Sequence, residues 1–567
     1  MARIIFLFCF LFVAVASRQV QQHPLVEGSH NDAVAKEPEI LPAMLGALDV
    51  LQQDYYINWQ GIWPTSIDWT SAVIGTYLSA ALTTLSTSFS LVPSSSEQRY
   101  PSKANENRIN KYFSQLVASY FGQNAFGLRT QAYDDMLWVV LGWLESINFI
   151  NVHSELHYKV REGDEPWYGK QWIPSFAHRA RIFWDLASQG WDTALCNGGM
   201  IWSPYLAPYK NAITNELFIA ASISMYLYFP GDTNDSPFLM EGVGNEPPGG
   251  PTGPRDPKYL AAAVQAYKWL ENSNMTNDKG LYTDGFHISG LPNRPYKNET
   301  KGNTKCDARN NMVFTYNQGV LLTGQRGLYE ATNARSYLED GHKLVQDVIA
   351  ATGYDLKKDR SLEDWDKYSQ HIPKWHGLGR AGILEEACDS GGYCSQNGHT
   401  FKGIFFHHFT SFCSQLPPHF VQPGETFNIR QYQIDKDWHD QNCMSYKGWV
   451  LRNAKAAIKT KNADGQFGTW WGAPKSRPDL DVQVELPEGA VDYINMGIPQ
   501  NKEWVDGKAS SEATRHNMAF DAFTVELSGN PVRGKRDLND RGRGRTVETQ
   551  GGGLSVLRAA WEWEGRV

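Results

Sequence analysis

The stretch that decides the fold is QAYDDMLWVVLGWLE, residues 131–145, in which two neighbouring acids precede a strongly apolar run with a helical pattern. From about Asp68 onward, amphipathic stretches with apolar residues at helical spacing recur, separated by connections rich in Gly, Pro and Asn. No comparable series of alternating strands occurs, which indicates a mostly α protein. We predict twelve helices, at residues 68–86, 106–122, 131–149, 175–189, 211–229, 257–271, 314–332, 335–352, 400–415, 433–459, 508–527 and 546–563.

Twelve helices can form six hairpins, and six hairpins can close into a toroid with an inner ring, an outer ring and a central cleft. The alternative is an open α-solenoid, whose sequence would show a repeat of fixed period. The spacings here are irregular and no repeat motif recurs, so we favour the closed all-α barrel. A stretch rich in Gly and Arg, 531–545, is interpreted as a solvated loop before the last helix.

The composition excludes several classes of protein. The chain has 567 residues, of which 41% are hydrophobic and 20% charged, so it is not intrinsically disordered. The formal net charge of −8 is negative, whereas proteins that bind the phosphate backbone of nucleic acids are usually positive, so we expect no nucleic-acid partner. The aromatic share of 13% suits either a thick core or the stacking of sugar faces.

The N-terminus resembles a secretory signal. Arg3 precedes an apolar run over 4–15, and Ala14-Val15-Ala16 has the small-x-small cleavage pattern. The run is too short to span a bilayer. We therefore expect a signal peptide at 1–16, a poorly structured extension at 17–60, and one barrel domain at 61–567. The expected mature protein is secreted, extracellular or associated with the cell wall, monomeric, and without a stable membrane anchor, since 551–567 lacks a hydrophobic tail.

The cysteines fit an oxidising compartment. Six remain after removal of the signal, an even number that predicts disulfides. Cys388 and Cys394 are expected to close a small local loop. We predict no metal site, because paired ligands at short spacing do not recur. Sequons beginning at Asn234, Asn274 and Asn298 fit a glycoprotein of a eukaryotic secretory route.

The pair Asp134-Asp135 is the strongest candidate for chemistry. Acids in the first turn of a helix can simply cap it. Here, however, Tyr133 and the apolar residues after the pair would raise the pKa of at least one carboxyl, and the neighbouring charge would raise it further. Two carboxyls that titrate apart are what glycoside hydrolysis with retention needs, with the groups about 5–5.5 Å apart.

Several further blocks accompany this pair in order. They are YDDMLW (133–138), CNGGMIW (196–202), YKNAITNELF (209–218), FTYNQGV (314–320), LYEAT (328–332), FKGIF (401–405) and FGTWW (467–471). From about residue 68 to the end, this set resembles glycoside hydrolase family 76, the bacterial and fungal α-1,6-mannanases and related fungal cell-wall mannan-processing proteins.

The resemblance implies an (α/α)6 barrel and a retaining reaction without a cofactor, with Asp134 as the nucleophile and Asp135 as the acid/base. The candidate substrate-binding residues are Tyr133, Trp202, Asn211, Asn317, Gln318, Trp470 and Trp471. For each, a structural role is the alternative: the amides can tie helices together, the rings can fill the core, and Asn211 can cap the helix that follows it.

Our interpretation is a retaining hydrolase of α-1,6-linked mannan or mannooligosaccharides. Two alternatives stay open. The first is a transglycosidase that joins a mannoprotein or anchor glycan to cell-wall glucan as the acceptor. The second is a catalytically silent mannan-binding protein of wall assembly. The intact acid pair favours an enzyme, since a binder would not need it.

Overall fold

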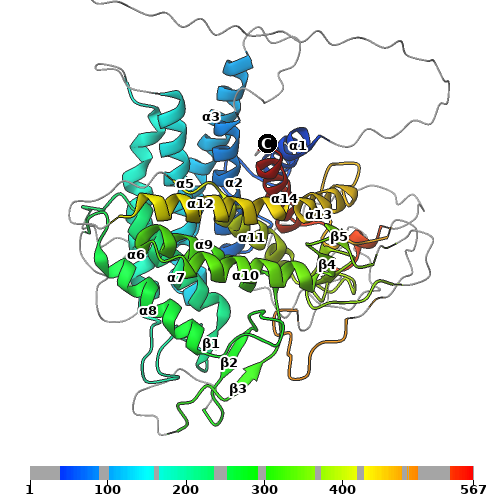
Figure 1. Cartoon of the computed structure of the whole chain (residues 1–567). Coiled ribbons are helices and arrows are strands. Elements are labelled where there is room, and N and C mark those ends of the chain that lie inside the picture. Colours follow the sequence, from blue (N-terminus) through cyan, green and yellow to red (C-terminus); the bar gives the residue numbers. More distant parts are fainter. Residues whose placement is uncertain are drawn as a thin grey trace, which may run out of the picture. The chain divides into compact units, whose positions relative to one another are not determined.

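The computed structural model describes residues 39–88, 101–158, 165–234, 252–291, 302–363, 365, 372–417, 427–474, 482, 484–495 and 537–565. The predicted signal peptide at 1–16 and the predicted helix at 508–527 lie outside these residues, as do residues 531–536 of the 531–545 stretch. The described part is mainly helical (Figure 1).

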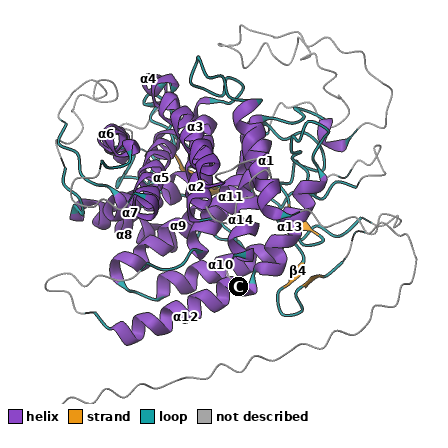
Figure 2. Ribbon diagram, turned by 90° about the horizontal axis from the view of Figure 1, so that it is seen from above, coloured by secondary structure: helices purple, strands orange, loops and turns teal. Residues whose placement is uncertain are grey.

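Six helices form a closed inner ring by their mutual contacts. Figure 2 views the helices from above. Each inner helix packs against the next one along the chain, and the last returns to the first. They are buried on nearly all sides, which explains why their sequences are apolar all round rather than along one stripe. The inner helices are α2 (Asp68–Thr87), α5 (Tyr133–His157), α7 (Ala212–Tyr228), α9 (Thr315–Thr332), α11 (Gln396–Cys413) and α14 (Val547–Glu564).

The outer helices alternate with the inner ones along the chain. Helices α3, α6, α8 and α10 pack on α2, α5, α7 and α9, while α1 and α13 pack on α14 and α12 contacts α11. This alternation confirms the (α/α)6 barrel. The outer helices are α1 (Ile40–Gln53), α3 (Pro101–Gly122), α6 (Ile173–Ser188), α8 (Pro257–Asn272), α10 (Ser336–Ala351), α12 (Ile429–Ser445) and α13 (Lys447–Lys459); a short α4 (Ala125–Leu128) follows α3.

Ten of the twelve predicted helices are confirmed, with shifted ends. The predicted helix 433–459 is wrong as a single element. It divides at Tyr446, whose hydroxyl bonds the His342 ring (2.8 Å), close to where Cys443 is tied to Cys413.

The prediction of a poorly structured extension at 17–60 is also wrong for Ile40–Gln53, which form helix α1. The apolar face of α1, including Met44, Leu48 and Leu51, is buried against the barrel. The sequence interpretation gave weight to prolines and polar residues and missed this apolar spacing.

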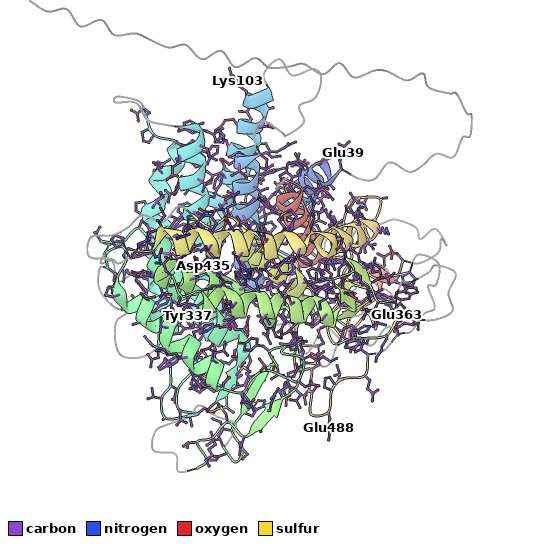
Figure 3. All side chains as sticks on the ribbon, viewed as in Figure 1. Glu39, Lys103, Tyr337, Glu363, Asp435 and Glu488 are labelled. Atoms are coloured by element: carbon purple, nitrogen blue, oxygen red, sulfur yellow. A yellow bond between two sulfur atoms is a disulfide. The ribbon has the colours of Figure 1, made fainter. Side chains whose placement is uncertain are left out.

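Three small antiparallel sheets were not predicted, because their strands have two or three residues each. The largest has the order β1 (Tyr209–Asn211), β2 (Gly285–His287), β3 (Ala308–Asn310), and Tyr209 lies opposite His287. Segment 484–495 lies beside the end of β3. The side-chain amide of Asn311, the residue after β3, donates to the Glu488 carbonyl (2.7 Å; Glu488 is labelled in Figure 3). Two hairpins pair β4 (Tyr354–Asp355) with β5 (Arg360–Ser361) and β6 (Gly379–Arg380) with β7 (Ile383–Leu384).

The first turns of the inner helices lie at the same end of the barrel. The Trp69 indole of α2 donates to Asn397 of α11 (2.8 Å), and the Thr70 hydroxyl donates to Glu548 of α14 (2.7 Å). The Thr315 N–H of α9 donates to Glu386 (2.9 Å), which precedes α11. The positive ends of these helix dipoles therefore gather where the acid pair begins α5.

Three disulfides join the six remaining cysteines: Cys196–Cys306, Cys388–Cys394 and Cys413–Cys443. The predicted local loop between Cys388 and Cys394 is confirmed. Among the described residues, we find no helix with the length and apolar character needed to cross a bilayer.

Candidate active site

The two acids occupy the first turn of α5. The Asp135 carboxylate accepts the backbone N–H of Ala132 (3.2 Å), and the Asp134 carboxylate accepts the N–H of Asp135 (3.1 Å). The capping role considered from the sequence is therefore present. Both side chains nevertheless remain partly exposed, whereas Tyr133 and Met136 on either side are buried. Solvent thus reaches the pair at the end of an otherwise buried helix.

Burial controls the protonation of the pair. It raises the pKa of Asp134 well above its ordinary value, and the charge of Asp135 raises it further. Burial also raises the pKa of Asp135, to about 7, and the nearby charge of Asp68 acts in the same direction. The helix N-terminus and the backbone N–H groups favour ionisation but do not offset the desolvation. Near neutral pH, the pair therefore retains at least one proton, as an acid/base site requires.

Trp202 contacts the pair from the loop between α6 and α7. Its side chain hydrogen-bonds the Asp134 carboxyl and lowers the pKa of that group. Its carbonyl accepts the N–H of Tyr133 (2.9 Å), and its own N–H donates to the Tyr209 carbonyl of β1 (2.8 Å). Strand β1 and the start of α5 therefore fix Trp202 at both sides of its backbone. Trp202 therefore lies beside the acids, and its contact with a sugar stays a prediction.

A buried lysine and a disulfide hold the loop that carries Trp202 in place. The Lys210 ammonium is fully buried and donates to the carbonyls of Gly199 (2.5 Å) and Asp192 (3.1 Å). Burial lowers the pKa of Lys210 to about 7. The disulfide Cys196–Cys306 ties the same loop to the chain before β3.

Tyr133 is 7% exposed and packs closely over Gly190, where any side chain would meet its ring. The structure therefore gives it a packing role, and its backbone rather than its ring carries the link to Trp202.

Three residues near the acids were not predicted. Tyr316 of α9 is buried, stacks on Phe401 (centroids 3.8 Å apart), and lies close enough to Asp134 for that charge to raise its pKa. Asp68 interacts electrostatically with Asp135. Trp69 is partly exposed and stacks on Trp138, one turn after the acids (5.7 Å). Tyr316 lies in the FTYNQGV block, and Asp68 and Trp69 begin the first predicted barrel helix. All three therefore lie at the start of a predicted helix, and this position was the sequence feature that could have identified them.

The three predicted amides have different surroundings. The prediction that Gln318 binds the sugar is wrong. Its side-chain NH2 group donates to the carbonyls of Tyr282 (2.9 Å) and Phe314 (3.0 Å), and its side-chain oxygen accepts the N–H of Tyr282 (2.8 Å). Asn211 is 5% exposed at the N-cap of α7, and Asn317 is fully buried in α9. Within the described part of the chain, the side-chain oxygens of Asn211 and Asn317 have no hydrogen-bond partner.

The two predicted tryptophan platforms are core residues. Trp470 is fully buried with Val482 and Leu538, and Trp471 is 4% exposed and packs on Phe406 (5.7 Å). The edge of Trp471 borders a cavity whose described walls contain neither acid of the pair. Neither ring is therefore presented as a flat platform beside Asp134 and Asp135.

Two groups of potential metal ligands occur among the described residues. They are His342 with His439 and Cys443, and Asp389 with Cys388 and Cys394. All three cysteines are in disulfides, so their sulfurs are not thiolate ligands. The Asp389 carboxylate is paired with the Lys402 ammonium (2.5 Å). Neither group has the free ligands of a metal site.

The closed double ring and the acid pair at its N-terminal end define an (α/α)6 barrel with a candidate acid/base site. Comparison with known proteins agrees: residues 252–431 match glycosyl hydrolase family 76. The resemblance to that family is confirmed over these residues.

Curated relatives of the chain are yeast proteins. The chain is 26% identical over 223 residues to mannan endo-1,6-alpha-mannosidase DFG5 of Saccharomyces cerevisiae, which is 38% of this chain and 34% of the relative. It is 23% identical over 254 residues to mannan endo-1,6-alpha-mannosidase DCW1 of the same organism, with 43% and 41% covered. The chain thus spans well under half of these relatives in the matched regions.

The solved structures to which the chain is similar are more distant in sequence. An inactive variant of the α-1,6-mannanase GH76A of Salegentibacter sp. HEL1_6, in complex with α-1,6-mannotetrose, is 14% identical with a TM-score of 0.48, covering 92% of this chain and 99% of that chain. Dfg5 of Chaetomium thermophilum, in complex with glucosamine, is 13% identical with a TM-score of 0.46, covering 78% and 85%.

Proposed function

We propose that this protein is a retaining glycoside hydrolase acting on α-1,6-linked mannan or mannooligosaccharides. The observation that carries the proposal is the pair Asp134-Asp135, partly open to solvent and held at raised pKa by burial. The relatives named as mannan endo-1,6-alpha-mannosidases support the choice of substrate.

In the proposed mechanism, the Asp134 carboxylate attacks the anomeric carbon while the glycosidic C–O bond breaks. The proton of Asp135 goes to the departing sugar oxygen, and a mannosyl ester on Asp134 results. Asp135, now ionised, then takes a proton from water as the water oxygen attacks the anomeric carbon and releases Asp134. Adjacent carboxyls suit this route, because an inverting mechanism needs room for water between them.

The raised pKa values of both acids bear on these roles. Burial raises the pKa of each carboxyl, so the pair holds a proton near neutral pH. The order of roles comes from the family resemblance, and it requires this proton to be on Asp135 when the sugar binds. The Trp202 hydrogen bond favours an ionised Asp134, since it lowers the pKa of that group. The three nearby groups Asp68, Trp69 and Tyr316 are proposed to border the reacting sugar.

The transglycosidase and the silent binding protein remain the alternatives. Transfer to a glucan hydroxyl shares the same covalent intermediate and differs only in the acceptor. The raised pKa values of two adjacent acids favour catalysis over mere binding, because binding gains nothing from them. We further propose a secreted, monomeric glycoprotein associated with the cell wall, consistent with the three disulfides. Exposed Asn274, in a left-handed turn, is the sequon position that the structure describes best.

The decisive experiment is incubation with α-1,6-mannotetraose, followed by analysis of product mass and anomeric configuration. Shorter α-anomers as first products support retaining hydrolysis, and longer products or products joined to an added glucan oligosaccharide support transfer. Binding without products, or first products of inverted configuration, contradicts the proposal. The variants Asp134→Asn and Asp135→Asn should each lose turnover, while Glu339→Gln, an exposed acid in the first turn of α10, should retain it.

A further inference from the structure

Two polar side chains without a partner are buried at the interface between α7 and α9. Glu216 of α7 and Asn317 of α9 are both 0% exposed. Within the part of the chain that the structure describes, neither carboxyl oxygen of Glu216 has a hydrogen-bond partner, and neither the oxygen nor the nitrogen of the Asn317 amide has one. Buried polar groups are seldom left in this state, because each has lost its hydrogen bonds to solvent.

The contacts between the two helices place both side chains at the same interface. A side chain at Gly324 of α9 would collide with Ile219 of α7, so these two positions mark the faces on which the helices touch. Asn317 precedes Gly324 by about two turns, and Glu216 precedes Ile219 by about one turn. Positions at these spacings share one face of a helix, so Asn317 faces α7 and Glu216 faces α9.

The two side chains also lie at similar depth. The contact repeats further along, where a side chain at Gly327 would meet Ile223, so the helices run in the same direction. In this register Asn317 is level with Ala212, the first residue of α7, and about one turn before Glu216. Because side chains on a helix lean toward its N-terminus, the Glu216 side chain extends toward Asn317.

Glu216 is also suited to bond a neutral molecule. Burial raises the pKa of its carboxyl well above the ordinary value, and the charge of Asp284 acts in the same direction. The group is therefore a neutral acid, which donates a hydrogen bond as well as accepting one. Only a small molecule can be enclosed with it, since neither Glu216 nor Asn317 is exposed.

We propose that Glu216 and Asn317 share a buried water molecule, and that this water positions the first turn of α9 for the reaction. Buried water in proteins typically makes about three hydrogen bonds to polar groups that have no other partner. The carboxyl and the amide offer such atoms from two helices at one interface. The inference rests on the proposed hydrolase, in which Tyr316 borders the reacting sugar.

The first turn of α9 carries the residue that lies nearest to the acids. Tyr316 is close enough to Asp134 for that charge to raise its pKa. The residue before it, Thr315, is held by Glu386, and Gln318 is bonded to the backbone of the segment before β2. The shared water adds a link to α7, which packs on α5, the helix of the acids. Loss of this link would therefore move the Tyr316 ring relative to the acid pair.

A crystal structure of the full chain tests the water directly. It should show a water oxygen about 2.7–3.2 Å from both the Glu216 carboxyl and the Asn317 amide. A direct bond between the two side chains, or no water that contacts both, would overturn the proposal. This result does not depend on whether the protein turns over a sugar.

Two variants of Glu216 test the positioning role. Glu216→Gln keeps the shape and the hydrogen-bonding atoms, so kcat for α-1,6-mannotetraose should stay close to that of the unmodified protein. Glu216→Met keeps the length but removes both oxygens, so kcat should fall about 10-fold or more with KM unchanged. The matched control Ile223→Val changes only apolar packing on the same face of α7 and should leave kcat unchanged. Equal kcat for the Gln and Met variants would overturn the positioning role.

A double variant tests whether the two residues share one water. Asn317→Leu should remove the same water as Glu216→Met, so the two together should lose no more kcat than the worse single variant. Losses of kcat that multiply would overturn the shared water, and a rise in KM for Asn317→Leu would make this amide a sugar ligand instead.

Urea unfolding of the same variants should show the same non-additivity without any turnover. If the unmodified protein fails to cleave α-1,6-mannotetraose, the proposed hydrolase fails, while unfolding and the crystal structure still decide whether the water is shared. Failure of the hydrolase and failure of the shared water are therefore distinguishable.

Discussion

Replacing Asp135 by Asn should abolish turnover and at the same time stabilise the protein at alkaline pH. The pKa of Asp135 rises from 3.8 in its ordinary state to about 7 in the fold. Between these values the unfolded chain loses its proton while the folded protein keeps it. The free energy of unfolding therefore falls as pH rises from about 4 to 7, and stays lowered above 7.

The size of this effect follows from the same values. A rise from 3.8 to about 7 corresponds to roughly 4 kcal/mol at 1.36 kcal/mol per pKa unit, and partial exposure of the side chain reduces it to about 2–4 kcal/mol. Asn keeps the shape and an oxygen that can accept the Ala132 N–H, but it carries no charge. Asp135→Asn should therefore match the unmodified protein at pH 4 and exceed its stability by about 2–4 kcal/mol at pH 8.

Urea unfolding monitored by tryptophan fluorescence at pH 4 and pH 8 measures this difference, alongside turnover of α-1,6-mannotetraose. Glu339→Gln is the matched control, because its side chain is 53% exposed and should show no such pH-dependent gain. Equal stability of Asp135→Asn and the unmodified protein at both pH values would refute the reasoning that burial raises this pKa. Retained turnover would refute the role in catalysis.

Three further outcomes are expected. Trp202→Phe keeps a ring but loses the hydrogen bond to Asp134, so kcat for α-1,6-mannotetraose should fall about 10–100-fold with little change in KM; an unchanged kcat would contradict the contact. Replacing both Cys196 and Cys306 by Ser opens a link over 110 residues and should lower the free energy of unfolding in urea by about 3–5 kcal/mol, whereas no loss would show that the loop is held by other contacts. Gln318→Leu should cost about 2–3 kcal/mol in the same unfolding assay and leave KM unchanged, because its hydrogen bonds are internal; a large rise in KM would restore it as a sugar ligand.

Most of the helix positions could be predicted, because burial in a ring imposes long apolar stretches at helical spacing. The division at Tyr446 could not, since it depends on bonds from other helices to Tyr446 and Cys443. Helix α1 was missed for the opposite reason: its apolar face was present in the sequence but was outweighed by the prolines around it. Strands of two or three residues leave no periodic signal at all.

By itself, the sequence determined an all-helical chain with two adjacent acids at the start of an apolar helix, because covalent neighbours and apolar spacing are local properties. Which residues accompany those acids was decided by the tertiary structure alone. In the packed barrel, Gln318 points into the core, and Trp202, Tyr316 and Asp68, from three other segments, lie near the acids. The pKa values that suit the pair to catalysis arise from that same burial, since desolvation is a property of the packed barrel and not of the residues in order.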